Sequence, residues 1–351
     1  MTPSPDAGRG DRHFGRAPRP RHVRGAPTPR NIGVDLLRIL SVVAVVLGHA
    51  YPHMPGEEYI QIWRMPLFFL LSGYFLAESR SFGGELRVRW RTLGVPYLTW
   101  LVLLSLVVLA VSPTPAAFDD GVVLGALHGG AMTDMPYLAF WFISVLFFAA
   151  LLLRLVVALP WWVGVLVAVA GLTAAELPDS QMAYTFLGLG LVPACMAYML
   201  AGWWFRRLQH LVPAPRTTGA TAVVVGLGAV ALGAETMNMK WSGFGTYLLS
   251  PALAVLICCG AVLLFSTTVD ARLRRSPGAV RLVSELVRTG TLVVFLHPLV
   301  LWAVGGLGVP HPLVAVLLAL AVCWPLGVWV NRTWASPYLT GLPRPARSGP
   351  G

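Results

Sequence analysis

Hydrophobic residues fall in long blocks along the 351-residue chain, with short polar segments between them. Most of these blocks are about 16 to 22 residues long, which is the length that an α-helix needs to cross a bilayer. The pattern predicts an all-α, polytopic integral membrane protein with about ten transmembrane helices. The predicted spans lie at roughly 34–52, 60–77, 93–112, 137–157, 161–176, 185–205, 217–234, 246–268, 290–308 and 312–331.

The composition supports this fold class. Hydrophobic residues make up 56% of the chain and charged residues only 12%, about half the charged share of an ordinary soluble domain. The cysteines all lie inside apolar blocks, without CxxC or metal-type spacing, so we expect small buried hydrophobic residues and no disulfide. We also predict no metal site and no permanently bound cofactor. The cysteines are Cys195, Cys258, Cys259 and Cys323.

The basic residues predict the orientation of the helices. With the N-terminus placed inside, the inner segments hold 23 of the 26 Lys and Arg residues, while the outer segments hold only Arg64 and Lys240. This asymmetry follows the positive-inside rule and favours an even number of spans with both termini cytoplasmic. The net charge of +11 is therefore explained by membrane orientation rather than by nucleic-acid binding. We predict a multi-pass protein of the plasma membrane.

The chain divides into three segments. Residues 1–30 contain seven Arg residues with scattered Pro and Gly and no apolar core, which predicts a disordered cytoplasmic arm rather than a signal peptide. The arm would rest on anionic lipid or would be a solvated tail without a role. Residues 31–335 form the transmembrane domain, and residues 336–351 form a cytoplasmic tail.

The first predicted span carries polar residues that a membrane helix normally lacks. Asp35 and Arg38 are one turn apart, and Arg38 and His49 are eleven residues apart. Eleven residues make about three helical turns, so both side chains lie on nearly the same face, roughly 16 Å apart along the axis. Ionisable groups are costly in hydrocarbon, so we expect this stripe to line one passage inside the bundle. We take Asp35, Arg38 and His49 as the candidate catalytic residues.

Each of these residues also has a structural interpretation. His49 is suited to act as a general base toward a hydroxyl group, or it is a histidine satisfied within the bundle or at the interface. Arg38 would bind a phosphorylated donor, or it extends to the cytoplasmic surface as a snorkelling side chain. Asp35 would orient Arg38, or it simply favours the positive end of the helix.

The second predicted span is unusual because Arg64 interrupts it. The remaining apolar stretch is about a dozen residues, which is better shielded by protein than by lipid, so we expect this span to lie against the first. It contains Ser72-Gly73. This pair would provide a nucleophile at a flexible joint, or small residues for close helix packing.

A series of motifs resembles the integral-membrane acyltransferase-3 family. In order, the motifs are Asp35-x-x-Arg38 followed after ten residues by His49, the run Met65–Tyr74, the basic loop Arg87–Arg91 before Pro96-Tyr97, Phe140-Trp141-Phe142, and His297-Pro298. They cover about residues 31–330, and the spacing of Arg38 and His49 is the most specific of them. The sequence departs from the family where Arg64-Met65 precedes the Pro-Leu-Phe-Phe run, since a Val or an aromatic residue is usual there.

The resemblance implies an O-acyltransferase that moves an acetyl or other short acyl group from cytoplasmic acyl-CoA to a hydroxyl of a sugar, such as one in a surface polysaccharide. It implies that His49 is the catalytic histidine and Arg38 the essential arginine. The CoA phosphates would bind the basic loop, or this loop is basic only because it is cytoplasmic. The cofactor-binding candidates are Arg87, Arg89 and Arg91.

Some residues near the candidate catalytic histidine would contact the acceptor. An additional guanidinium near His49, that of Arg64, would contact an acidic or polar acceptor, or a lipid phosphate. His297 would assist the acceptor, or it only caps a helix break before Pro298. We therefore take Arg64, Trp141 and His297 as the substrate-binding candidates.

The partners implied are acyl-CoA as the donor, a carbohydrate or glycosylated acceptor, and the lipid bilayer, and a homo-oligomer is compatible with the sequence. The alternative function is a transporter or flippase for a polar or lipid-linked metabolite. Against it, the sequence shows no matching pair of broken helices of the kind that marks inverted repeats. A third interpretation is a haem- or quinone-linked protein with His49 and His297 as axial ligands.

Overall fold

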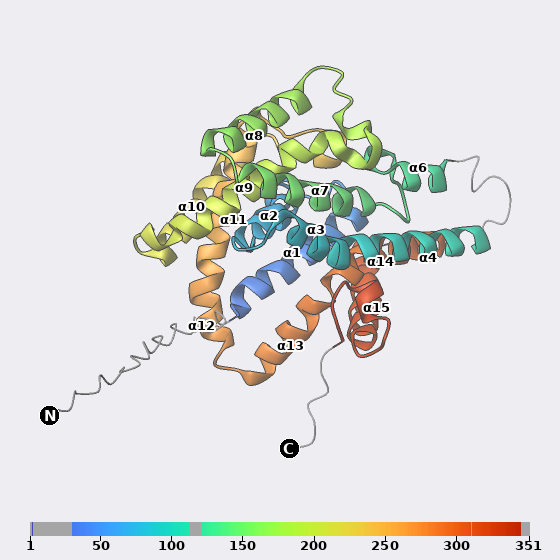
Figure 1. Ribbon diagram of the computed structural model, residues 1–351. Helices are drawn as coiled ribbons and strands as arrows, with labels where there is room; N and C mark the ends of the chain where they lie inside the picture. Colours follow the sequence, from blue (N-terminus) through green and yellow to red (C-terminus); the bar gives the residue numbers. More distant parts are fainter. Residues whose placement is uncertain (1, 3–29, 112–120, 310, 345–351) are drawn as a thin grey trace. The chain divides into compact units, whose positions relative to one another are not determined.

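The computed structural model describes residues 2, 30–111, 121–309 and 311–344 of the chain. The predicted arm at 1–30 and the last part of the predicted tail, residues 345–351, lie almost wholly outside the described residues. Residues from Asn31 onward form one compact unit. In the described part, every regular element is helical (Figure 1).

A helix occupies each of the ten predicted spans, because each apolar block can satisfy its backbone polar groups only within itself. These helices are α1 (Ile32–Ala50), α2 (Glu58–Tyr74), α4 (Val95–Val111), α7 (Phe140–Val156), α8 (Trp161–Glu176), α9 (Val192–Leu208), α10 (Pro215–Ala231), α11 (Leu249–Leu264), α14 (Gly290–Gly306) and α15 (Pro312–Asn331).

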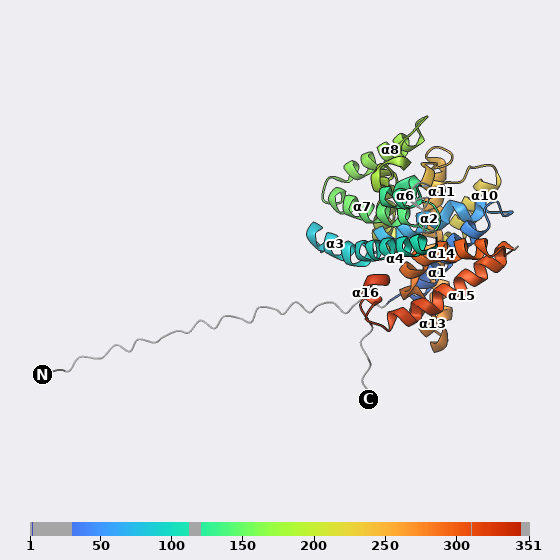
Figure 2. The same cartoon turned by 90° about the vertical axis from the view of Figure 1, so that its right-hand side faces the viewer.

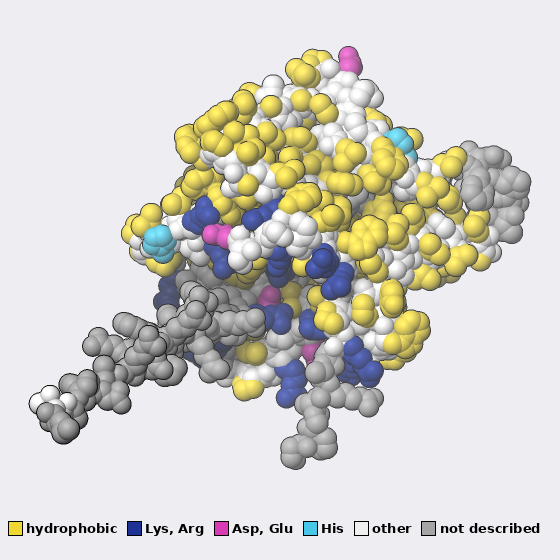
Figure 3. Space-filling view, viewed as in Figure 1, with side chains coloured by type: hydrophobic (Ala, Val, Ile, Leu, Met, Phe, Trp, Pro, Cys, Tyr) yellow, Lys and Arg dark blue, Asp and Glu magenta, His cyan; other side chains and the backbone are white. Residues whose placement is uncertain are grey.

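The described helices confirm a multi-pass membrane fold without fixing the number of spans. Five helical stretches are long and apolar enough to cross a membrane alone, and a sixth is added if the bent pair Pro277–Arg288 and Gly290–Gly306 is one span. The number ten and the cytoplasmic termini stay predictions. Hydrophobic side chains cover most of the face shown in Figure 3, whereas Lys and Arg side chains gather over and between α3 (Phe82–Arg89) and α13 (Pro277–Arg288).

Shorter elements connect the long helices. A π-helical turn, Trp90–Gly94, joins α3 to α4, and a second, Phe265–Val269, joins α11 to α12 (Asp270–Leu273). Two further short helices are α6 (Val122–His128) and α16 (Ser336–Leu339). Short 3₁₀ turns lie at Gly130–Met132, Met182–Tyr184, Phe186–Leu191, Gln209–Leu211 and Met239–Trp241.

The described part of the predicted tail packs onto the helical unit. Ser336 and Thr340 are buried. The indole N–H of Trp100 in α4 donates to the carbonyl of Leu339 at 3.0 Å. Residues 336–344 are therefore continuous in packing with the predicted domain that ends at 335.

The helix α2 lies inside the bundle, against α1, α9 and α11 (Figure 2). The expected contact between the first two spans is thus confirmed. Arg64 interrupts the apolar run of the second span but not its helix, since α2 runs unbroken from Glu58 to Tyr74. The guanidinium of Arg64 is 3.5 Å from a carboxylate oxygen of Glu57 and 3.5 Å from the carbonyl of Ala44. These partners let the helix bury a charge that lipid would not accept.

Glycines bring the backbones of α2 and α9 into direct contact. A Cβ built on Gly73 would lie 1.9 Å from the carbonyl oxygen of Met199, and one built on Gly202 would lie 2.0 Å from the carbonyl oxygen of Leu70. Each helix thus presents a glycine to a carbonyl of the other, as small residues do where membrane helices cross closely.

The Gly202→Ala variant should lose stability, by about 1–3 kcal/mol, because its methyl group must push α9 away from the backbone of α2. The measurement is the thermal unfolding midpoint of the purified protein in detergent. The control is Gly228→Ala in α10, where a Cβ has no neighbour within 4 Å. Equal midpoints for the two variants would contradict the close crossing.

Candidate active site

Two cavities meet along one face of α1. The first has a volume of about 400 Å³, and its lining combines apolar side chains with three arginines. We call it the arginine cavity, and its cations are Arg38, Arg80 and Arg89. The second has a volume of about 460 Å³, and its lining includes imidazole, basic and acidic groups. We call it the histidine cavity, and its charged or titratable residues are His49, His53, Glu57, Arg64, Asp134 and Lys240.

The stripe predicted on the first span runs along both cavities. Arg38 and Val42 line the arginine cavity, while Val45 and His49 line the histidine cavity. Steps of four, three and four residues keep these side chains on one face of the helix. The structure therefore turns the stripe toward the interior, but it divides the expected single passage into two cavities.

Asp35 forms an ion pair with Arg38 at the start of the stripe. Its buried carboxylate lies 3.7 Å from Nη1 of Arg38, and the side chain of Arg38 is 35% exposed. The guanidinium of Arg38 also lies over the ring of Phe75, 4.5 Å from its centroid. Asp35 is not part of the described lining of either cavity. Its position is that of a residue that orients Arg38.

His49 is paired with His297, which sequence reasoning placed only with the acceptor. Nδ1 of His49 lies 2.9 Å from Nε2 of His297, and the two rings are nearly parallel. Nδ1 of His297 lies 2.9 Å from the carbonyl of Val293, one turn earlier in α14. His297 is fully buried, so its position is fixed by packing as well as by these two bonds.

This chain of hydrogen bonds assigns the protons of the neutral rings. A carbonyl only accepts, so His297 carries its proton on Nδ1 and presents a bare Nε2. His49 must then donate from Nδ1 to that nitrogen, which leaves the lone pair on Nε2 of His49. The pair therefore leaves a nitrogen that can accept a proton on a residue that lines the histidine cavity.

Arg64 fits beside His49 because the residue before this histidine, Gly48, has no side chain. A Cβ built on Gly48 would lie 1.5 Å from Nη1 of Arg64, so the guanidinium occupies the space that any other residue at position 48 would fill. Only 9% of Arg64 is exposed. The hydrogen bonds of its guanidinium to Ala44 and Glu57 are both long at 3.5 Å. The guanidinium retains donors for a group in the cavity.

Lys240, the only lysine of the chain, was not among the candidates from the sequence. Its ammonium donates to the carbonyl of Thr133 and lies 4.7 Å from the centroid of the Trp241 ring. Burial lowers the pKa of Lys240 to about 8, although the negative charge of Asp134 opposes this shift. A lone lysine next to a tryptophan in an outer segment was the only available signal, and nothing in the sequence places it near His49.

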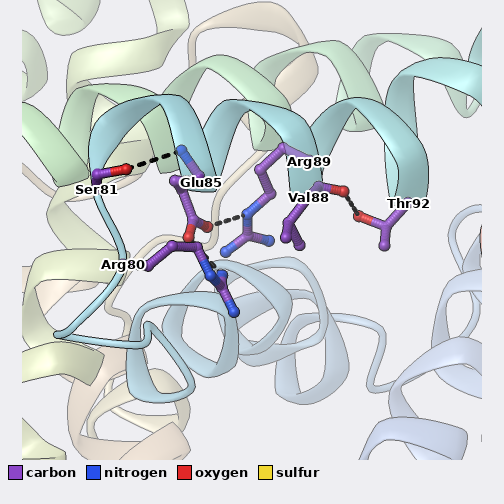
Figure 4. A network of polar contacts seen from close by, with 7 residues as sticks. Arg80, Ser81, Glu85, Val88, Arg89 and Thr92 are labelled. Atoms are coloured by element: carbon purple, nitrogen blue, oxygen red, sulfur yellow. Dashed lines mark hydrogen bonds and ion pairs between the residues drawn. The ribbon is translucent and has the colours of Figure 1, made fainter.

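A buried carboxylate organises the arginine cavity. Glu85 of α3 is fully buried and accepts hydrogen bonds from Arg80 and, at 2.7 Å, from Arg89 (Figure 4). Arg80 and Glu85 were missed, although the four-residue spacing of Glu85 and Arg89 is the signal of a helical ion pair. Of the three predicted loop arginines, only Arg89 lines the cavity, whereas Arg87 and Arg91 are exposed and are not part of its lining.

Ser72 and Trp141 lie in different cavities. The hydroxyl of Ser72 is buried in the lining of the arginine cavity and has no hydrogen-bond partner among the described residues. It is thus separated from His49, which argues against a serine nucleophile activated by that base. Trp141, predicted to bind substrate, lines the histidine cavity together with Arg64 and His49.

The fold and the site together define a class of protein. It is an integral membrane protein with an arginine-lined cavity next to a second polar cavity, and a hydrogen-bonded pair of histidines, His49 and His297, lies at the second cavity. A family model described as an acyltransferase domain, that of the acyltransferase-3 family, matches residues 31–332. The chain therefore belongs to the acyltransferase-3 family and is a membrane acyltransferase. No curated protein and no solved structure gives a significant match to the chain.

The low pKa of Lys240 predicts that the folded protein becomes more stable as the pH rises into the alkaline range. The unfolded lysine titrates near about 10.4 and the folded one at about 8, so between these values the unfolded state binds more protons and stability rises with pH. We expect a rise on the order of 1–3 kcal/mol in the wild type that is missing in Lys240→Met. The measurement is the difference between the two unfolding midpoints at several pH values. Parallel curves would refute the lowered pKa of Lys240.

Proposed function

We propose that this protein is an O-acyltransferase that moves an acetyl or other short acyl group from cytoplasmic acyl-CoA to a hydroxyl of a sugar-containing acceptor, such as a surface polysaccharide. The observation that carries the proposal is the His49–His297 pair where a cavity with three arginines approaches a second polar cavity. Membership of the acyltransferase family supports the reaction class.

The proposed setting is the plasma membrane, with ten spans and both termini in the cytoplasm. The arginine count of the loops supports this orientation. In this orientation the Arg38 end of α1 faces the cytoplasm and the His49 end faces outward. The donor then enters from the side where CoA is made, and the acceptor enters from the side where surface polysaccharides lie.

The arginine cavity is the proposed donor site. Arg38, Arg80 and Arg89 would bind the phosphates of CoA through charge-assisted hydrogen bonds. Glu85 holds two of these guanidinium groups in place, which lowers the entropy lost when the donor binds. The hydroxyl of Ser72, which has no hydrogen-bond partner within the part of the chain that the structure describes, is available to an amide of the pantetheine arm.

His49 is the proposed general base. Its Nε2 takes the proton of the acceptor hydroxyl as the oxygen attacks the carbonyl carbon of the thioester. The carbon–sulfur bond then breaks, and the imidazolium returns its proton to the departing thiolate. The products are the O-acyl ester and free CoA, with no other reactant. His297 acts as a positioning residue, because it keeps the proton of neutral His49 on Nδ1.

Arg64 is proposed to stabilise the negative charge that develops on the carbonyl oxygen. A fixed cation in a cavity with little water lowers the energy of such an oxyanion more than solvent does. Its long contacts to Ala44 and Glu57 leave donors free for this purpose. Trp141 offers an aromatic face for the acceptor in the same cavity.

Loss of the base should remove acyl transfer. We expect His49→Ala to reduce turnover by about 10²–10⁴-fold, and His297→Phe to reduce it less and to alter its pH profile, because the proton of His49 is then no longer directed. The measurement is release of CoA thiol from acetyl-CoA by native membrane vesicles, with mass spectrometry of surface glycans for added acetyl groups.

The control is His210→Ala, which changes an exposed histidine. Normal turnover by correctly inserted His49→Ala would reject the proposed base. The transporter alternative predicts substrate movement without consumption of acyl-CoA, so the same assay separates the two functions.

The two loop arginines Arg87 and Arg89 should differ as donor ligands. A lost charge-assisted hydrogen bond costs about 1.5–3 kcal/mol, so we expect Arg89→Gln to raise the KM for acetyl-CoA about 10- to 100-fold. Arg87→Gln removes the same charge from the same helix, but from its exposed side, and should change KM by less than about threefold. Equal effects would show that the loop acts only through its overall charge.

A further inference from the structure

The two cavities share three lining residues. These are Phe68 of α2, Phe142 of α7 and Val294 of α14, each of which borders both the arginine cavity and the histidine cavity. We call these three side chains the septum. The rings of Phe68 and Phe142 are in contact, with their centroids 5.4 Å apart and their planes inclined at 60°.

The aromatic side chains of the septum pack against the protein core. Phe142 is only 5% exposed, and its ring packs edge to face on Phe69, with centroids 5.4 Å apart. Because protein interiors are close-packed, a large displacement of this ring requires its neighbours to move. Phe68 is half-buried and packs against the main core, so the septum is a firm boundary rather than a loose surface.

The side chains that surround the boundary between the two cavities at the septum are apolar. The fourth wall is α1, where Val42 faces one cavity and Val45 faces the other. The arginines lie on one side of this level, and His49 and Arg64 lie on the other. A charged phosphate would lose its hydration and gain no partner at this level, whereas the uncharged end of an acyl-pantetheine arm would not.

We propose that the septum selects the acyl group by its width. This inference rests on the proposed function, in which the thioester must pass from the arginine cavity to His49 with its acyl group leading. A straight short chain has about the same cross-section as the unbranched cysteamine and β-alanine part of the pantetheine arm that follows it. An acyl group branched next to the carbonyl is wider, so it passes only if Phe142, Phe68 or Val294 is displaced.

The test compares two donors of equal carbon number and charge, butyryl-CoA and isobutyryl-CoA. The measured quantity is the ratio of their kcat/KM values, from release of CoA thiol by native membrane vesicles that contain the acceptor. For the wild type we expect butyryl-CoA to be preferred by at least about tenfold, the size of effect that one misplaced methyl group has in a tight site.

The variants Val294→Ala and Phe142→Leu each widen the septum and should lower this preference by at least about fivefold. The control is Val145→Ala, which removes the same two methyl groups as Val294→Ala from a fully buried residue of α7 outside both cavities. It should keep the wild-type ratio. If Phe142→Leu fails to fold, Val294→Ala alone decides.

The proposal is overturned if the wild type uses both donors equally, or if the ratio stays the same in Val294→Ala. It is also overturned if Val145→Ala changes the ratio as much, since the effect would then come from general loosening. Absence of any acyl transfer from acetyl-CoA by the wild type is a different result, because it rejects the proposed function itself.

Discussion

The hydrogen bond between His49 and His297 is the contact on which the rest of the site depends. It joins two residues 248 positions apart in the chain, and so it ties the first helix to the late helix α14. Together with the carbonyl of Val293, it decides which nitrogen of His49 carries a proton and which is bare. In a protein whose described interior is mostly apolar, one bond of this kind fixes both a tertiary contact and a protonation pattern.

The ion pairs of the interior likewise have two effects, because they stabilise buried charges and also orient side chains. A charge inside an apolar bundle is tolerated only with a partner, and Arg64 is buried against Glu57 while Glu85 is buried between two arginines. These pairings are also what directs the guanidinium groups into the cavities. The energetic cost of burying charge and the orientation of the site are therefore two results of one arrangement.

The sequence alone was sufficient for the helices and for one side of the site. Apolar blocks located the long helices, and the eleven-residue spacing placed Arg38 and His49 on one face of α1, because both depend on local periodicity. The pairing of His49 with His297 and the position of Lys240 depend on which distant segments meet, which periodicity does not encode. The burial of Arg64 could not be predicted for the same reason, since its partners include Ala44 on another helix.

A chain with a single lysine has one side-chain amine, and here that amine lies in the wall of the histidine cavity. Its lowered pKa leaves a substantial share of it as the nucleophilic free base in mildly alkaline buffer. A small amine-directed reagent would therefore attach to Lys240 inside the folded chain as well as to an N-terminal amine. A spectroscopic label attached to Lys240 would therefore report from the wall of the histidine cavity.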